Sequence, residues 1–250
     1  MNGPNSSTRY FEPLLGVVFD LDGTLVESQH DFPRMRRGVV RLAEAHGVVP
    51  GHLSIRETIP RLMEAARSEI ERSGSPEGVL YRFDAEVNKA IDAIEMESLP
   101  RTVPRSGAVE LLRTLFARGF RNGVLTRSSD AFCRSALLKT GLIDYFPYLR
   151  TRSAPGPSKP SPEALLLLLK EMGVPPDRAV YIGDHLLDVE CATRAHVRFY
   201  GLLPEKPNAD SMTADRFRAT GAQDVVANLS ELAQLLGVGR PRMDRPTPAT

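Results

Sequence analysis

Residues 14–24 read LLGVVFDLDGT, and the expected architecture of the whole chain follows from this stretch. The apolar run predicts a buried strand over 14–19 that ends in a turn at Gly23, where a side chain would block a tight backbone path. Alternation along an extended backbone places Asp20 and Asp22 on the same side, so the two carboxylates should converge on one small space. Such a pair repels unless a cation or proton lies between the two groups, which favours a Mg²⁺ site.

The rest of the chain alternates short apolar segments with helical patterns. Strands are expected at 121–125, 147–150, 179–182, 197–203 and 224–227, and helices at 107–118, 129–140, 161–172, 186–194 and 229–236. This alternation predicts an α/β fold with a doubly wound, Rossmann-like parallel sheet that is covered by helices on both faces.

The segment 28–104 breaks this alternation, since it offers helical patterns at 36–46, 55–72 and 79–97 and no convincing strand. We therefore expect a catalytic core of residues 14–27 and 105–236 with a helical cap, 28–104, inserted after the first strand. Ligands bind at that end of the strands in open α/β sheets, so the cap would cover the site. A flexible N-terminus (1–13) and a disordered Pro/Arg-rich tail (237–250) are expected to flank the core.

Composition excludes several classes of protein. Of the 250 residues, 42% are hydrophobic and 25% charged, which is ordinary globular usage and excludes a fully disordered chain. The net charge is +1 and no basic block occurs, so we expect no nucleic-acid partner. The longest apolar run is far shorter than the ~20 residues that span a bilayer, and the N-terminus lacks the apolar core of a secretory signal. We therefore expect a cytoplasmic protein with no membrane partner, in which Cys133 and Cys191 are buried, reduced thiols.

Two further groups stand at or near the ends of predicted elements. Thr126 ends the strand at 121–125, and its hydroxyl and the following N–H groups could form an anion cradle, although Ser and Thr are also ordinary helix N-caps. Lys159 lies between prolines ahead of a helix and is one of only five lysines in the chain. It could neutralise charge that develops during group transfer, or it could be a solvated loop lysine.

The segment GDHLLD at 183–188 follows the apolar run 179–182. Asp184 and Asp188 are four residues apart, so they lie near one face if a helix begins between them. Asp184 would then be a third acidic metal ligand, and Asp188 would support it or orient Lys159. Helix capping is the alternative interpretation of this motif.

The order of these motifs resembles the haloacid dehalogenase-like hydrolase superfamily over roughly 14–236. The resemblance implies that Asp20 is a nucleophile that forms an aspartyl-phosphate, and that Asp22 is the general acid and base. Thr126 and Lys159 correspond to the family residues that hold the phosphoryl group, with Arg127 beside them. Asp184 corresponds to a Mg²⁺ ligand, next to Asp20 and the main-chain oxygen of Asp22. Gly23, Thr24 and Asp188 are implied as supporting residues.

The inserted cap resembles the subgroup that contains phosphoglycolate phosphatase and β-phosphoglucomutase. Asp22 favours phosphoryl transfer over dehalogenation, because a dehalogenase has no leaving alcohol to protonate. The expected function is a Mg²⁺-dependent phosphatase that hydrolyses a small phosphorylated metabolite, as a monomer or homodimer. The alternatives are a mutase acting on a sugar phosphate and a non-catalytic regulatory module that binds phosphate or Mg²⁺.

Several positions depart from the family pattern or have no assigned role. Glu27 stands where relatives usually carry Asp, and His185 where Ser, Thr or Asn is frequent. His196 stands where Gly is common, and we interpret it as a packing residue. A last group could reach an anionic substrate, but we interpret it as solvated helix charge. It consists of His30, Arg34, Arg36 and Arg37.

Overall fold

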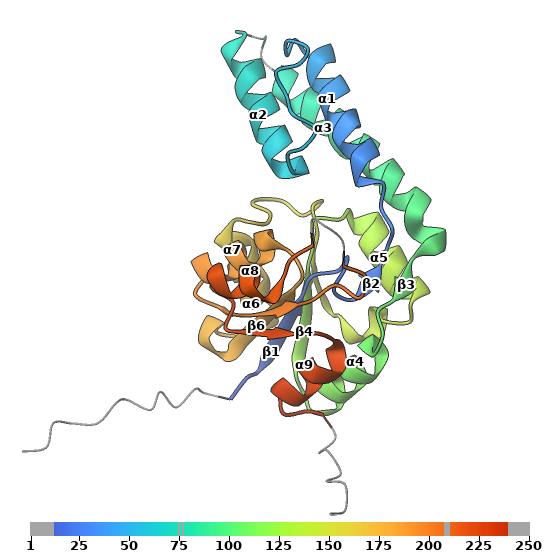
Figure 1. Cartoon of the computed structure of the whole chain (residues 1–250), viewed down its shortest axis with the longest axis vertical. Helices are drawn as coiled ribbons and strands as arrows, with labels where there is room; N and C mark the ends of the chain where they lie inside the picture. The colour runs from blue at the N-terminus through green and yellow to red at the C-terminus, as the bar shows by residue number, and fades with distance from the viewer. Residues whose placement is uncertain (1–12, 75, 77, 208–210, 240–250) are drawn as a thin grey trace, which may run out of the picture.

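A parallel six-stranded sheet forms the centre of the computed structural model, which describes residues 13–74, 76, 78–207 and 211–239 (Figure 1). The strand order is β5-β4-β1-β6-β7-β8, and every pair is parallel. The strands are β1 (Gly16–Phe19), β4 (Arg121–Leu125), β5 (Tyr148–Arg150), β6 (Ala179–Gly183), β7 (Arg198–Leu202) and β8 (Asp224–Val226). The chain builds outward from β1 first toward β5 and then toward β8, so the topology changes direction beside β1. Ligands bind at such a switch point in open α/β sheets.

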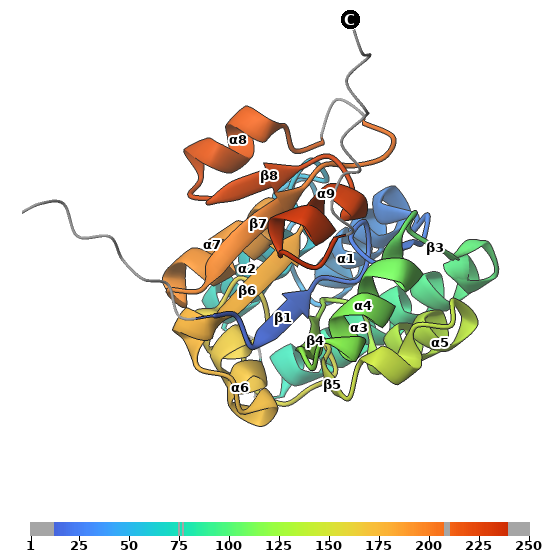
Figure 2. The same cartoon turned by 90° about the horizontal axis from the view of Figure 1, so that it is seen from below.

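Helices cover both faces of this sheet, as Figure 2 shows, which confirms the predicted doubly wound fold. One face packs against α4 (Ala108–Ala117), α5 (Asp130–Lys139) and α9 (Leu229–Leu235), and the other against α6 (Pro162–Met172), α7 (Leu186–Arg194) and α8 (Ala214–Ala219). Alternation along β1 divides the two cores: Val17 and Phe19 lie in the first and Val18 in the second. Sequence analysis missed α8, which is only six residues long.

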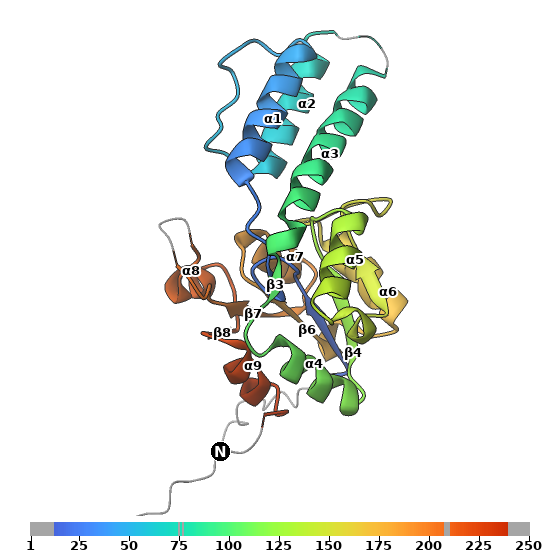
Figure 3. The same cartoon turned by 90° about the vertical axis from the view of Figure 1, so that its right-hand side faces the viewer.

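Three helices form a separate layer beyond the carboxyl ends of the strands (Figures 1 and 3). They are α1 (Phe32–Ala45), α2 (Ile59–Arg72) and α3 (Val79–Ser98), and we call residues 32–98 the cap. The cap has a hydrophobic core of its own, which includes Met35, Val39, Leu62, Ala66, Phe83 and Val87. Its base is a two-residue antiparallel pair, β2 (Val26–Glu27) with β3 (Val103–Pro104), which is too short to leave a pattern in the sequence. Short 3₁₀ turns lie at η1 (Leu99–Arg101), η2 (Ile143–Tyr145) and η3 (Pro176–Arg178).

Helix bounds in the cap differ from the prediction where capping decides them. Helix α1 begins at Phe32, four residues before the expected start, because the Asp31 carboxylate accepts a hydrogen bond from the Arg34 N–H at 2.8 Å. Pro33 occupies the first turn, where its missing N–H costs nothing. Of the predicted N-terminal and C-terminal tails, residues 1–12 and 240–250 lie outside the described residues. Val238 packs into the sheet core. Within the described part of the chain, no helix has the length and apolarity to cross a membrane.

Candidate active site

The carboxyl ends of three neighbouring strands bring the first motifs together. Asp20 follows β1 and donates its backbone N–H to Ile182 of β6 at 2.9 Å, and Asp184 follows β6 directly. Thr126 follows β4 on the other side of β1 and donates its N–H to Arg150 at 3.0 Å. Adjacent strands are ~4.8 Å apart, so the sheet alone places these motifs within one small site.

Lys159 reaches into this site from the loop before α6. Its Nζ donates hydrogen bonds to Asp20 Oδ1 at 2.5 Å and to Asp188 Oδ1 at 2.7 Å, and its side chain is only 4% exposed. Burial by itself would lower the pKa of Lys159, but the charges of Asp188 and Asp20 outweigh it and raise that pKa above its usual value. The solvated-lysine interpretation is therefore wrong, and Lys159 is a buried cation between two carboxylates.

Asp20, Asp184 and Asp188 form an acidic cluster in which one oxygen from each lies within 4.8 Å of the others. Burial raises the pKa of Asp20 well above its usual value, partly offset by Lys159. Burial, and then the charge of Asp188, raise the pKa of Asp184 to about 7. Buried carboxylates that resist ionisation in this way are a favourable place for a cation with oxygen ligands.

Within this cluster, Asp188 differs from the other two because its oxygens are already engaged. Besides Lys159, Asp188 accepts hydrogen bonds from the Tyr181 hydroxyl at 2.7 Å and from the His185 N–H at 3.1 Å. The last contact is half of a capping box at the start of α7, in which His185 is the N-cap residue. Asp20 and Asp184 are therefore the side chains that could hold a metal, and Asp188 fixes the position of Lys159.

Two glycines make room for these carboxylates. Gly23 has a φ of +80°, and a Cβ there would collide with the Asp184 carboxylate. A Cβ on Gly183 would lie 2.5 Å from Asp188 Oδ2. Thr24, next in the turn, donates its hydroxyl hydrogen to Asp184 Oδ1 at 2.9 Å. The DxDGT turn and the GDxxxD turn therefore fit together only because both glycines lack a side chain.

Asp22 corrects one sequence expectation, because its carboxylate does not join the acidic cluster. Asp22 Oδ2 accepts a hydrogen bond from the Ser128 hydroxyl at 2.6 Å, and Oδ1 faces His30 Nε2 at 3.2 Å. Burial opposes ionisation, but the contacts with His30, Ser128 and Ser28 outweigh it and lower the pKa of Asp22. The two carboxylates of DxD leave the turn in different directions because these polar partners hold Asp22.

His30 is buried, so the interpretation as solvated helix charge is wrong for this residue. Its side chain is 2% exposed, its Nδ1 lies 2.8 Å from Ser98 Oγ, and its ring packs edge-on against Phe132. Arg34, in contrast, is half exposed and pairs with Glu97 at 2.5 Å on the surface, as expected.

His196 also departs from its predicted role as a packing residue. It is exposed and has a φ of +55°, one residue after Ala195, the C-cap of α7. A left-handed residue at this place terminates a helix, a conformation that Gly adopts without strain.

Thr126 and the three residues after it have different roles in the structure. Sequence analysis had left open whether Thr126 contributes to an anion cradle or caps a helix. Ser129, not Thr126, is the N-cap of α5, since its hydroxyl accepts from the Phe132 N–H at 3.3 Å. The buried Thr126 hydroxyl accepts the Ser128 N–H at 3.0 Å. Arg127 donates to the Lys159 carbonyl at 2.6 Å. Burial, followed by neighbouring arginines, lowers the pKa of Arg127 to about 10, so this cation lies in a site that favours an anion.

Sequence analysis missed Arg152 and Glu95, which join the cap to the core beside the site. Arg152 donates to Glu95 Oε1 at 2.8 Å and to Asp92 Oδ1 at 2.9 Å, both on α3. It also donates to the Arg127 carbonyl at 2.8 Å. These partners are separated by more than twenty residues, so no local pattern could have identified them.

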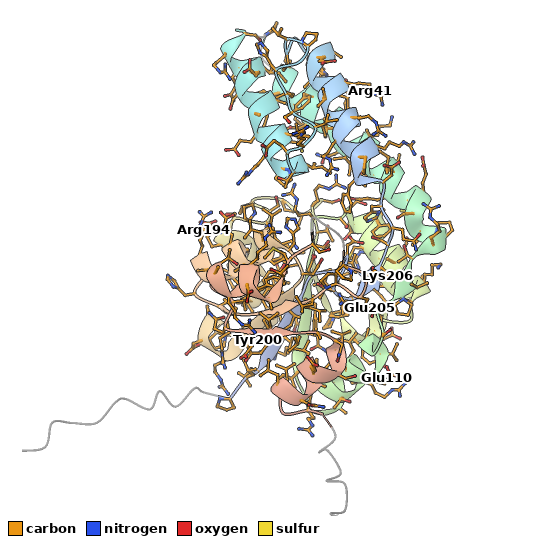
Figure 4. All side chains as sticks on the ribbon, in the orientation of Figure 1. Arg41, Glu110, Arg194, Tyr200, Glu205 and Lys206 are labelled. Carbon is orange, nitrogen blue, oxygen red and sulfur yellow. The ribbon has the colours of Figure 1, made fainter. Side chains whose placement is uncertain are left out.

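Arg105 is a second residue that sequence analysis missed. It is 2% exposed and donates to the carbonyls of Gly23 and Leu203, which connects the DxDGT turn to the end of β7. Its Nε lies 3.7 Å from Glu205, a residue labelled in Figure 4, whose carboxylate also accepts the Ser106 N–H at 3.1 Å. Arg105 therefore fixes the DxDGT turn against the residue that follows β7.

Known proteins resemble this chain in sequence. Residues 14–196 match the sequence profile of the haloacid dehalogenase-like hydrolase family. The chain is 28% identical over 210 residues to the N-acetylmuramic acid 6-phosphate phosphatase of Pseudomonas aeruginosa, covering 81% of this chain and 89% of the relative. It is 29% identical over 239 residues to the phosphoglycolate phosphatase of Rhodospirillum rubrum, covering 92% of this chain and 93% of the relative.

A solved structure shares the fold. The hydrolase of the same family from Deinococcus radiodurans R1, with bound phosphate and sodium, superimposes with a TM-score of 0.60 at 22% identity. The match covers 92% of this chain and 99% of that chain. The layered core with its helical cap is therefore an architecture that this chain shares with solved proteins.

Proposed function

Because the chain belongs to the haloacid dehalogenase-like hydrolase family, we propose that it is a Mg²⁺-dependent phosphatase that hydrolyses a small phosphate monoester through an aspartyl-phosphate on Asp20. The observation that carries the proposal is the buried Lys159 ammonium, 2.5 Å from Asp20 and next to Asp184. A nucleophilic carboxylate, a fixed cation and a second carboxylate for a metal are the groups that phosphoryl transfer needs.

Asp20, Asp184 and the main-chain oxygen of Asp22 would hold the metal. The donor set fits Mg²⁺ because all of its atoms are oxygens. Burial raises the pKa values of Asp20 and Asp184, and a bound cation would lower them again and favour the ionised carboxylates. When bound, Mg²⁺ neutralises charge on the phosphoryl oxygens and orients them for in-line attack.

The chain's own residues would carry two half-reactions. In the first, an Asp20 carboxylate oxygen forms a bond to phosphorus, the ester P–O bond breaks, and Asp22 gives its proton to the departing oxygen. In the second, Asp22 takes a proton from water, the water oxygen bonds to phosphorus, and the Asp20–phosphorus bond breaks to release inorganic phosphate. In this structure the contacts with His30 and Ser128 lower the pKa of Asp22 and favour its role as base; its role as acid requires that it take up a proton before the ester bond breaks.

The remaining candidate residues would bind the phosphoryl group. Lys159 and Arg127 supply positive charge, and the Thr126 hydroxyl lies at the end of β4 beside them. Gly23, Thr24 and Asp188 would support the site by holding Asp184 and Lys159 in place. The inserted cap, proposed to span 28–104, would select the substrate. Phosphatase relatives that act on phosphoglycolate and on a sugar phosphate support a small phosphorylated metabolite as that substrate.

The test is release of inorganic phosphate from a panel of small phosphate monoesters, with Mg²⁺ or with chelator, for wild type and Asp20→Asn. The proposal predicts activity that requires both Mg²⁺ and Asp20. Transfer of the phosphoryl group to a second hydroxyl of a sugar phosphate, without net phosphate release, would favour the mutase. Binding of Mg²⁺ and phosphate without turnover of any ester would favour a regulatory module and overturn the enzyme.

A further inference from the structure

We propose that His30 is a positioning residue for the general acid and base: it holds the Asp22 carboxylate in place and connects it to the end of the cap helix α3. This inference rests on the proposed function, because it assigns a role that acts through Asp22. The observations that carry it are three contacts of one buried side chain, and none of them involves the acidic cluster of the metal site.

The first contact is with Asp22 itself. His30 Nε2 lies 3.2 Å from Asp22 Oδ1. Both atoms are fully buried, and neither makes a hydrogen bond of good geometry in the part of the chain that the structure describes, so their short contact is an electrostatic one. A buried polar atom without a partner is costly, so each of the two groups determines where the other lies. The other oxygen, Oδ2, is held by Ser128 of the core at 2.6 Å. His30 and Ser128 thus contact one carboxylate oxygen each, and together they fix the plane of the Asp22 carboxylate.

The second contact joins the linker before α1 to the end of α3, where the chain leaves the cap. His30 lies just before α1, in the outgoing linker, and its Nδ1 is 2.8 Å from Ser98 Oγ at the end of α3, where the chain returns. Ser98 is itself 1% exposed and donates to the Glu95 carbonyl at 2.7 Å. One imidazole in the outgoing linker therefore bridges Asp22 to the last residue of α3.

The third contact fixes the ring. Its centroid lies 4.7 Å from that of Phe132 on α5 and 5.7 Å from that of Phe32 at the start of α1, edge-on to both. Because aromatic neighbours from the core and the cap restrict the imidazole, it cannot rotate to follow Asp22. The ring is therefore the rigid member of the pair, and the carboxylate takes its position from the ring.

A positioning role for His30 affects substrates with good and poor leaving groups unequally, whereas a packing role would affect them equally. Asp22 is needed as an acid only when the leaving oxygen is a poor leaving group, such as an alkoxide. A nitrophenolate leaves without a proton. Displacing Asp22 should therefore lower kcat/KM, which reports formation of the aspartyl-phosphate, far more for an alkyl phosphate than for p-nitrophenyl phosphate; kcat also contains the hydrolysis step that both substrates share.

The test compares His30→Asn with His30→Gln. The Asn amide can replace only the ring atom that faces Ser98, whereas the Gln amide can reach the position of Nε2 beside Asp22. We expect His30→Asn to lower kcat/KM for an alkyl phosphate by about 10–100-fold, and kcat/KM for p-nitrophenyl phosphate by less than about 3-fold. His30→Gln should restore most of the alkyl phosphate rate. Ser98→Ala, which removes the far end of the bridge, should produce a smaller effect with the same leaving-group bias.

His46 provides a matched control, because its Nε2 lies 3.1 Å from Glu86 Oε2 and its ring packs edge-on against Phe83, away from the site. His46→Asn should leave the ratio of the two rates unchanged. Equal losses of kcat/KM on both substrates in His30→Asn, or no rescue by His30→Gln, would overturn the positioning role. Failure of the proposed function gives a different result, since the wild type would then show no hydrolysis that depends on Asp20.

Discussion

Glu95, near the end of cap helix α3, accepts a hydrogen bond at 3.0 Å from the backbone N–H of Ser129, the N-cap residue of core helix α5. A carboxylate at this place satisfies one of the free N–H groups of the helix and interacts favourably with its dipole. The other Glu95 oxygen accepts from Arg152 at 2.8 Å. The cap is thus joined to the core directly above the strand end that carries Thr126.

Replacing Arg152 should loosen this connection. In Arg152→Gln, Glu95 remains buried without its cationic partner, which costs about 3–5 kcal/mol in stability for a fully buried pair and less where water can enter. We expect a lower Tm, a higher KM for the phosphate ester, and faster hydrogen exchange at residues 28–31 and 99–104. Arg134→Gln is the control, because Arg134 pairs with Asp130 on the surface of α5. If Arg152→Gln and Arg134→Gln had the same hydrogen-exchange rates at these residues and the same KM, a role for Arg152 in joining the cap to the core would be contradicted.

Gly183 tests the close fit of the two motif turns. Gly183→Ala would place a methyl group 2.5 Å from Asp188 Oδ2 and displace the carboxylate that holds Lys159. Overpacking of this kind costs about 1–3 kcal/mol, and we expect kcat to fall at least about 10-fold because Lys159 moves with Asp188.

Gly38→Ala is the matched control for this substitution. Gly38 lies within α1, where an added Cβ meets nothing within 4 Å. It should gain about 0.5–1 kcal/mol in stability, because Ala favours the helix, with kcat unchanged. Wild-type activity in Gly183→Ala would show that Asp188 does not position Lys159.

Because the pKa of Asp184 is raised, we expect the stabilisation of the protein by Mg²⁺ to depend on pH. The pKa of Asp184 is raised to about 7 by burial and by the charge of Asp188. In the metal-free folded state Asp184 therefore stays protonated at pH values where it is ionised in the unfolded chain. Its contribution to the free energy of unfolding is lost as pH rises from about 4 through 7. Mg²⁺ requires the ionised form, so the rise in Tm on adding Mg²⁺ should be larger at pH 8 than at pH 6.

Thermal unfolding at pH 6 and pH 8, with Mg²⁺ or chelator, measures this dependence. In Asp184→Asn the increase in Tm with Mg²⁺ should be small at both pH values. A wild-type increase that is the same at pH 6 and pH 8 would mean that Asp184 does not exchange a proton for the metal.

The sequence was sufficient to predict the sheet, its helices and the residues at the strand ends. Apolar runs such as 14–19 and 179–182 are buried on both sides, and their polar termini must meet at one edge of a parallel sheet. This is why local pattern alone places Asp20, Thr126 and Asp184 together. Lys159 was identified from its setting between prolines, although its burial between Asp20 and Asp188 was not predictable.

Contacts between distant segments could not be predicted in this way. His30 was interpreted as solvated because it stands beside a group of charged helix residues in the sequence, and only the return of α3 at Ser98 encloses it. Asp22 was expected to join Asp20, but Ser128, 106 residues later, takes one of its oxygens. Side-chain direction at the site is therefore set by tertiary partners, whereas the position of each backbone segment is set by local pattern.

The most direct test of the account is detection of the covalent intermediate. The protein, as wild type and as Asp22→Asn, is mixed with substrate and Mg²⁺, quenched in acid within milliseconds to seconds, and digested for mass spectrometry. We predict that the peptide containing Asp20 gains the mass of one phosphoryl group, and that the gain persists longer in Asp22→Asn, where water is no longer activated. Release of phosphate from the substrate without a phosphorylated Asp20 peptide at any time point would contradict Asp20 as the nucleophile.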